Sequence, residues 1–98
     1  MNAEQYLLIC LAEEAAELSH AALKAARFGL DDQFHPEPER RPRALLLSEL
    51  YDLMAVTALL EEAGYLITDQ QVMESATEAK IAKVKHFMEY SKQRGRLI

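Results

Sequence analysis

Two acidic clusters interrupt the apolar surfaces of this chain and constrain its fold more than any other feature. The first occupies residues 13–17 within the apolar run 6–26, and the second occupies residues 49–52 within the run 45–60. Residues three or four positions apart share one face of a helix, so each cluster places two carboxylates side by side. Anions buried in an apolar stripe are costly unless a positive group binds them. The fold must therefore supply such a group or leave these carboxylates in water.

Helical geometry places several of the acidic side chains among leucines. At about 100° per residue, Glu14 aligns with the leucines and alanines of its run, and Glu17 lies at the edge of that stripe. Glu49 lies among the leucines of the second run, with Asp52 at its edge. Four carboxylates from two facing helices suit a hard divalent cation such as Mg²⁺. We therefore expect these four to bind metal as a set, whereas Glu13 points away from the centre of the stripe and is either solvated or a neighbour of the ligands. The plainer alternative is that all of them are helix formers on a solvated face.

The composition favours a single all-α domain. The chain has 98 residues, of which 50% are hydrophobic, and it contains only three glycines and three prolines. Strong helix formers dominate the remainder, and this length is close to the lower limit of what one core stabilises comfortably. We predict one domain over residues 1–98, with three main helices in an antiparallel bundle.

Capping residues mark the expected helix boundaries. We predict helices over residues 3–28 and 43–63, and a third that follows Thr68 and ends near Gln93. Asn2 is the expected N-cap of the first helix, and each glycine follows a periodic segment, as glycines at helix C-termini do. Thr68 precedes Gln71 by three residues, which is the spacing of a capping box.

Residues 30–42 differ from the helices around them. They hold all three prolines and an acidic pair at their start, and a cluster of arginines at positions 40, 41 and 43 closes the segment. A loop of this length in a small domain is typically either functional or a mobile connector. We expect a solvated connector, with a lid that contacts ligand as the alternative.

Charge and hydropathy exclude several classes of partner. A net charge of −5 without a continuous basic face argues against binding to a nucleic-acid polymer. The longest apolar run, residues 6–12, is too short to span a bilayer, and the first residues do not resemble a basic signal peptide. Cys10 is the only cysteine, so no internal disulfide forms, and we expect it to be a small buried hydrophobe. We expect a cytoplasmic protein with no membrane partner.

The apolar surface of the first helix predicts a homo-oligomer. Apolar residues occur on several of its faces, more than two further helices can cover. We expect a dimer or tetramer that completes a four-helix core. On the third helix Lys80 lies inside an apolar stripe, with Lys83 beside it. These lysines either extend their stems over the core or form salt bridges to the acidic pairs, and the functional alternative is that they bind phosphate oxygens opposite the metal.

Other kinds of catalytic site find little support in the sequence. There is no Ser-His-Asp set, no glycine-rich phosphate loop and no cysteine cluster. Glu17 and His20 match the Glu-x-x-His step of di-iron four-helix bundles. His20, however, projects roughly a third of a turn away from Glu14. A di-iron bundle built by dimerisation around Glu17, His20 and Glu49 remains an alternative.

The acidic motifs resemble those of the MazG-like, all-α nucleoside triphosphate pyrophosphohydrolases, which carry Glu-Glu-x-x-Glu on one helix and Glu-x-x-Asp on the next. Here the motifs are Glu13-Glu14-Ala15-Ala16-Glu17-Leu18 and Glu49-Leu50-Tyr51-Asp52-Leu53. The likeness covers nearly the whole chain. It implies Mg²⁺-dependent hydrolysis of a nucleoside or deoxynucleoside triphosphate to the monophosphate and pyrophosphate. It also implies dimers or tetramers with four-helix cores, and Mn²⁺ could substitute for Mg²⁺.

The resemblance also implies roles for individual residues. Carried over by position, the four carboxylates are the catalytic metal ligands, and Lys80 or Lys83 is the phosphate contact. Two features depart from the family: the long Pro/Arg-rich loop between the motifs, and Val84 and His86 where many relatives place Asn and Arg. The altered third helix keeps open a second interpretation. Under this second interpretation, the chain is a non-catalytic nucleotide-binding or helical interaction protein with the same fold.

Overall fold

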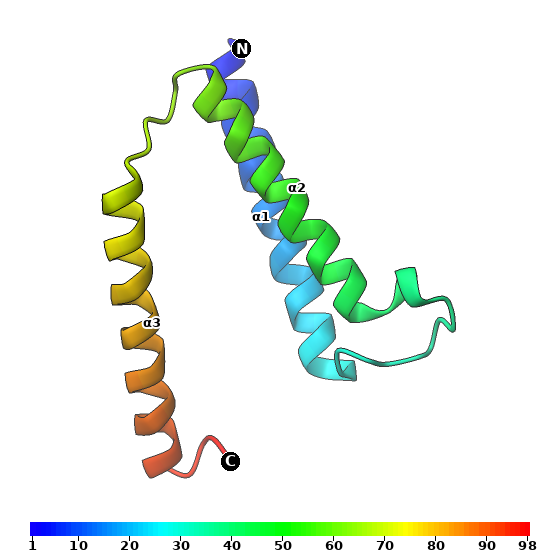
Figure 1. The fold of residues 1–98 in the computed structure, drawn as a ribbon. Coiled ribbons are helices and arrows are strands. Elements are labelled where there is room, and N and C mark those ends of the chain that lie inside the picture. The colour runs from blue at the N-terminus through cyan, green and yellow to red at the C-terminus, as the bar shows by residue number, and fades with distance from the viewer. The chain divides into compact units, whose positions relative to one another are not determined.

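The computed structural model describes all 98 residues, and every regular element is helical. In chain order the elements are α1 (Ala3–Phe28), the 3₁₀ turn η1 (Pro38–Arg40), α2 (Pro42–Glu62) and α3 (Gln70–Gln93) (Figure 1). The predicted all-α class with three main helices is confirmed. The chain divides into two compact units, Met1–Leu66 with α1 and α2, and Ile67–Ile98 with α3. The single domain and the antiparallel bundle stay predictions.

Helix α1 has the predicted bounds because both of its ends are capped locally. Asn2 accepts a hydrogen bond from the backbone N–H of Gln5 at 2.8 Å, and the Gln5 side chain accepts one from the Asn2 N–H at 3.0 Å. This reciprocal pair is a capping box, which satisfies two N–H groups that the first turn leaves free. At the other end Gly29, with φ of 99°, donates to the carbonyl of Ala25 at 2.8 Å. Asn2 is therefore confirmed as the N-cap.

Helix α2 begins and ends one residue earlier than predicted, which is within the ordinary scatter of helix ends. Pro42 occupies its first position, where the missing N–H removes no helical hydrogen bond. After the last turn Gly64 adopts a φ of 80°, which reverses the chain direction. The N–H groups of Tyr65 and Leu66 then donate to the carbonyl of Leu60 at 2.9 and 3.3 Å. These bonds close the helix in the manner typical of a C-terminal glycine.

Helix α3 begins one residue later than the predicted capping box requires. Its N-cap is Asp69, not Thr68, and Asp69 accepts a hydrogen bond from the N–H of Val72 at 3.0 Å. An aspartate suits this position well because its negative charge also meets the positive end of the helix dipole. α3 carries no buried residue. A single helix has no second element of its own against which to pack its apolar stripe.

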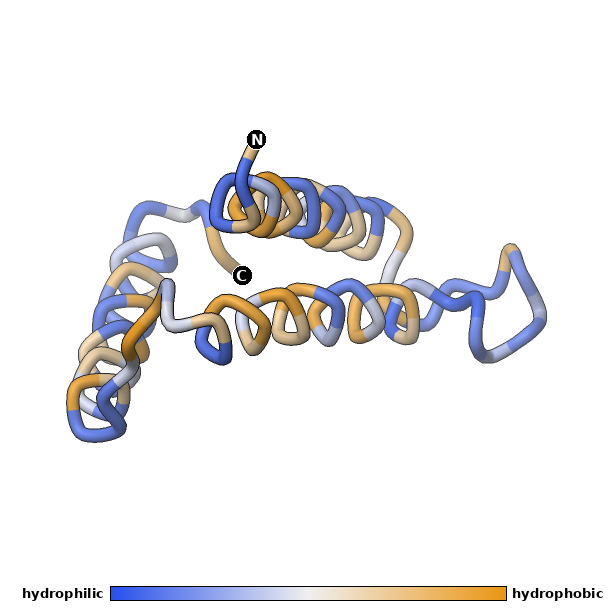
Figure 2. Tube along the Cα trace, turned by 90° about the horizontal axis from the view of Figure 1, so that it is seen from above, coloured by the Kyte–Doolittle hydropathy of each residue, from blue (hydrophilic) through white to orange (hydrophobic).

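Helices α1 and α2 lie side by side and run in opposite directions, so that together they form a hairpin (Figure 1). Hydrophobic residues recur along both helices, whereas the segment that connects them is mainly hydrophilic (Figure 2). Only Ala25 and Leu60 are buried in the hairpin. Its largest exposed apolar side chains include Tyr6, Leu8, Leu23, Tyr51 and Met54. A hairpin buries one stripe of each helix, and the apolar surface that remains agrees with the expected oligomer without testing it.

Candidate metal centre and adjoining pocket

Three of the predicted carboxylates meet where α1 packs against α2. Glu14 and Glu17 lie one turn apart on α1, and Glu49 comes from α2. One oxygen from each residue lies within 4.8 Å of the other two, so the three form a group that could hold a metal ion. Asp52, one turn beyond Glu49, is exposed and stands outside this group. Glu13 is exposed, as predicted.

Two oxygens of this carboxylate group are buried without a hydrogen-bond partner. They are Oε2 of Glu14 and Oε2 of Glu49, although each residue as a whole is only half-buried. Buried polar atoms in proteins are nearly always paired, because an unpaired one loses its interaction with water and gains nothing. Each of these oxygens can therefore accept a donor or a cation. Carboxylate oxygens are the ligands that Mg²⁺ prefers, so the residues present fit the divalent cation that the resemblance implies.

The crowding of carboxylates also changes their affinity for protons. Burial raises the pKa of Glu14, and the charges of Glu17 and Asp52 raise it further. Burial raises the pKa of Glu49 as well, and the neighbouring Glu17 carboxyl and the charge of Asp52 raise it further. A raised carboxyl pKa means that the fold disfavours the charged form. A nearby cation has the opposite effect, because it stabilises the ionised oxygens.

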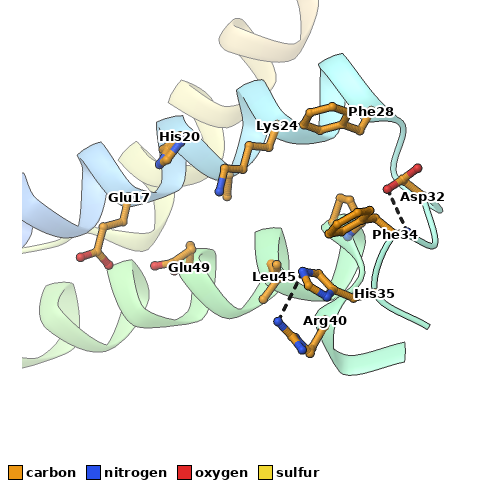
Figure 3. A pocket seen from close by; sticks show the side chains of 12 residues that line it. Glu17, His20, Lys24, Phe28, Asp32, Phe34, His35, Arg40, Leu45 and Glu49 are labelled. Atoms are coloured by element: carbon orange, nitrogen blue, oxygen red, sulfur yellow. Dashed lines mark hydrogen bonds between the residues drawn. The ribbon is translucent and has the colours of Figure 1, made fainter. Parts of the chain in front are cut away.

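A pocket of about 640 Å³ opens beside the carboxylate group (Figure 3). One face of α1, the first turns of α2 and the segment between the two helices form its walls. Glu17 and Glu49 lie at one end, Phe28 and Phe34 lie at the other, and Lys24 projects between them (Figure 3). The volume falls within the range of roughly 300–1,000 Å³ that is usual for small-molecule sites. The carboxylates are therefore accessible to a ligand much larger than a metal ion.

Polar contacts fix the path of the segment that forms the far wall of the pocket. The Arg43 guanidinium donates two hydrogen bonds to the Asp31 carboxylate, from Nε at 3.0 Å and from Nη2 at 2.9 Å. The Arg43 N–H donates to the carbonyl of Leu30 at 3.0 Å, and Arg41 donates to the carbonyl of Pro36 at 3.3 Å. The hydrogen bonds and charge of Arg43 also lower the pKa of Asp31. The expected solvated connector thus has a defined course along the pocket. The alternative, a lid that contacts ligand, is not tested by these contacts.

Most of the pocket lining was missed by the sequence reasoning. Lys24 and Phe28 follow Glu17 by seven and eleven residues, which puts each of them within about 20° of Glu17 around the helix. That periodicity extends the acidic stripe and could have identified both residues. His35 and Arg40, whose side chains are 3.3 Å apart, also line the pocket. They lie in a segment without helical periodicity, so their spacing in the sequence carries no comparable signal.

The remaining predicted site residues are not members of the group that could hold a metal ion. His20 lines the pocket. The group that could hold a metal ion contains only glutamates, so this group offers no histidine ligand to a di-iron centre. Lys80 and Lys83 are exposed residues of α3, in the second unit of the chain. Their contact with phosphate stays a prediction. Cys10 is a free thiol and is half-buried, where we expected full burial.

Comparisons with known proteins do not identify a family for this chain. A scan against protein-family models finds no match to this chain, and searches of curated proteins and of solved structures find none either. None of the helices combines the length and the hydrophobicity that crossing a membrane requires. The resemblance to the MazG-like family therefore rests on the two acidic motifs and their helical setting.

Proposed function

We propose that this protein hydrolyses a nucleoside or deoxynucleoside triphosphate to the monophosphate and pyrophosphate, with Mg²⁺ held by its carboxylate group. One observation carries the proposal: oxygens of Glu14, Glu17 and Glu49 converge within 4.8 Å at one end of a pocket, and two of these residues have a buried, unpaired oxygen. The choice of reaction is supported by the resemblance of the two acidic motifs to those of the MazG-like enzymes.

The positions of the carboxylates suit them to different roles in the reaction. Glu14 and Glu49 hold the cation, because their buried oxygens have no partner within the chain. When bound, Mg²⁺ neutralises phosphate charge and makes a coordinated water more acidic. Glu17 belongs both to the carboxylate group and to the pocket lining, so it can orient a water toward the α-phosphorus and accept its proton. Asp52 is close enough for its charge to raise the pKa of Glu14 and of Glu49, and we assign it as the fourth ligand.

The proposal includes a second copy of the chain. The hairpin leaves Leu8, Ile9, Tyr51 and Met54 between 45% and 59% exposed, and α3 buries none of its apolar residues. Apolar surface of this extent is typical of subunit interfaces. We infer that a four-helix core forms across subunits, as a dimer or a tetramer. Lys80 and Lys83 remain candidates for a phosphate contact within that assembly.

A pyrophosphate-release screen tests the proposal. The purified chain is incubated with each nucleoside and deoxynucleoside triphosphate in the presence of Mg²⁺, Mn²⁺ or a chelator. We expect release of pyrophosphate from at least one nucleotide, with either metal and not with the chelator. Glu49→Gln should lose this activity, whereas Glu61→Gln, an exposed change on the same helix, should retain it. Nucleotide binding without any release would contradict hydrolysis and favour the non-catalytic interpretation.

A further inference from the structure

We propose that the pocket fixes the direction in which the nucleotide binds. In this arrangement the phosphate chain lies between the carboxylate group and Lys24, and the base packs against Phe28 and Phe34. The inference rests on the proposed function and deepens it. It assigns Lys24 as a phosphate contact and Phe34, in the segment between α1 and α2, as the residue that recognises the base.

The order of side chains along α1 sets this direction. Glu17, Lys24 and Phe28 line the same pocket from one face of the helix, and they follow one another from the carboxylate group toward the connecting segment (Figure 3). At a rise of about 1.5 Å per residue, Glu17 and Phe28 are separated by roughly 16 Å along the helix axis. The pocket is therefore anionic at one end, cationic in its middle and aromatic at the other end. A ligand with a charged chain and a flat ring complements that order.

The Lys24 ammonium group is available to bind an anion. It makes no ion pair, since the one salt bridge of the chain joins Arg43 to Asp31. A lysine without a carboxylate partner can donate charge-assisted hydrogen bonds to phosphate oxygens. In contrast to Lys80 and Lys83, it lies in the same unit as the carboxylate group and lines the pocket together with Glu17 and Glu49. The phosphate chain would thus meet a cation on each side.

The aromatic end of the pocket leaves ring surface uncovered. Phe28 is 57% exposed and Phe34 is 83% exposed. The N–H of Phe34 donates to the Asp32 carboxylate at 3.2 Å, and the Phe34 ring meets the His35 ring edge-on at a centroid distance of 5.0 Å. Exposed aromatic rings gain by stacking with any flat heterocycle, because each base presents a π-face and removes apolar surface from water. Pro42 and Leu45 of α2 add apolar lining to the pocket.

The wall that carries Phe34 is held in place before any ligand binds. The pair of hydrogen bonds from Arg43 to Asp31 joins the two ends of the connecting segment. The hydrogen bond from Arg40 Nη2 to His35 Nε2, at 3.3 Å, links two further lining residues. A preorganised wall lowers the entropy lost when a ligand is bound. Phe34 can therefore act as a fixed surface for the base.

The test compares two ligands by calorimetry in the presence of Mg²⁺. One is the non-hydrolysable α,β-methylene analogue of each nucleoside triphosphate, and the other is inorganic tripolyphosphate, which lacks a base. Phe34→Ala should weaken binding of the preferred analogue about ten-fold and leave tripolyphosphate unchanged, because only base stacking is lost. Lys24→Ala should weaken both ligands by about ten-fold, because the phosphate contact is lost.

Matched variants separate these effects from folding. Gln33→Ala changes an exposed neighbour of Phe34 that does not line the pocket, and Lys85→Ala changes an exposed lysine of α3. Both should bind each ligand as the wild type does. Phe34→Tyr should retain most of the affinity for the analogue, and helical circular dichroism should be unchanged in every variant.

The outcomes distinguish this inference from the proposed function. If the wild type binds the analogues but releases no pyrophosphate from the natural nucleotides, hydrolysis fails and the binding direction stands. If the wild type hydrolyses nucleotides while Phe34→Ala and Lys24→Ala bind both ligands normally, the binding direction is wrong and the proposed function stands. A wild type that binds neither ligand overturns both.

Discussion

The hairpin contains two acidic regions whose carboxylates respond to their surroundings in opposite ways. In the carboxylate group, burial and neighbouring negative charges raise the pKa of Glu14 and of Glu49. In the connecting segment, the Arg43 guanidinium lowers the pKa of Asp31. The side chains are chemically alike, and it is their burial and their partners that differ. The comparison teaches that the paired carboxylate serves the structure, whereas the unpaired ones are available for a ligand, as perturbed groups at functional sites often are.

The largest effect should come from removing one unpaired carboxylate. Glu14→Gln or Glu49→Gln should lower metal-dependent pyrophosphate release by about 100-fold or more, because a ligand that stabilises transition-state charge is lost. Neither change should unfold the protein, since each removes a charge from a crowded group. Asp31→Asn is the matched control from the other region and should keep near-normal turnover. Comparable activity in all three variants would remove the distinction between the two regions.

The next largest effect concerns the exposed apolar surface of the hairpin that carries both regions. Leu8 is 45% exposed on α1 in the single chain. If a second copy covers this surface, Leu8→Glu places a charge in an apolar interface and should dissociate or unfold the oligomer. Analytical ultracentrifugation of the wild type should show a dimer or tetramer, and Glu4→Gln, a polar change on the same helix, should leave it intact. A wild type that sediments as a monomer at micromolar concentration would contradict the assembly.

A moderate effect is expected from metal binding on thermal stability. A cation that binds only the folded state stabilises it by mass action, by about 2.7 kcal/mol at a concentration 100 times the dissociation constant. Differential scanning calorimetry should therefore show a rise of several degrees in Tm with Mg²⁺. The rise should shrink sharply in Asp52→Asn and persist in Asp31→Asn. Equal shifts in these two variants would place the metal away from the carboxylate group.

The smallest effect is the pH dependence of stability in the metal-free protein. Glu14 and Glu49 have pKa values raised above 4.5, so the stability they contribute is complete below pH 4.5 and is lost as the pH rises through their raised pKa values. Asp31 has a pKa below 3.8, so its contribution is present above pH 3.8 and is lost as the pH falls through the lowered pKa. The carboxylate group and Asp31 therefore make stability depend on pH in opposite directions.

Thermal unfolding as a function of pH, with a chelator present, checks these signs. Between pH 4.5 and neutrality, Glu49→Gln should flatten the decline in Tm that the wild type shows. Asp31→Asn should lower Tm slightly at neutral pH and have no effect well below pH 3.8. A wild type and a Glu49→Gln variant with superimposable profiles would show that the carboxylate group is not crowded in solution.

The parts of the fold that were predictable depend on contacts between near neighbours in the sequence. The ends of α1 follow from Asn2 with Gln5, three residues apart, and from Gly29. The convergence of Glu14 with Glu17 likewise follows from helical spacing. The start of α3 was misplaced by one residue because both Thr68 and Asp69 can cap a helix, and the spacing to Gln71 favoured the wrong one.

The far end of the pocket was not predictable in the same way. It depends on the contact between Asp31 and Arg43, twelve residues apart, which sets the course of a segment without regular structure. No periodic pattern relates Phe34 or His35 to residues of α1. Lys24 is different, because it continues the stripe that contains Glu17 and could have been identified from spacing alone.

Direct measurement of metal binding tests the central claim, that the unpaired carboxylates hold a divalent cation. Electron paramagnetic resonance can follow the loss of free Mn²⁺ as protein is added, and Mg²⁺ can then compete for the site. The account predicts that the wild type takes up Mn²⁺, that Mg²⁺ displaces it, that Glu49→Gln abolishes uptake and that Asp31→Asn preserves it. Uptake by Glu49→Gln equal to that of the wild type, or no uptake by the wild type, would contradict the claim.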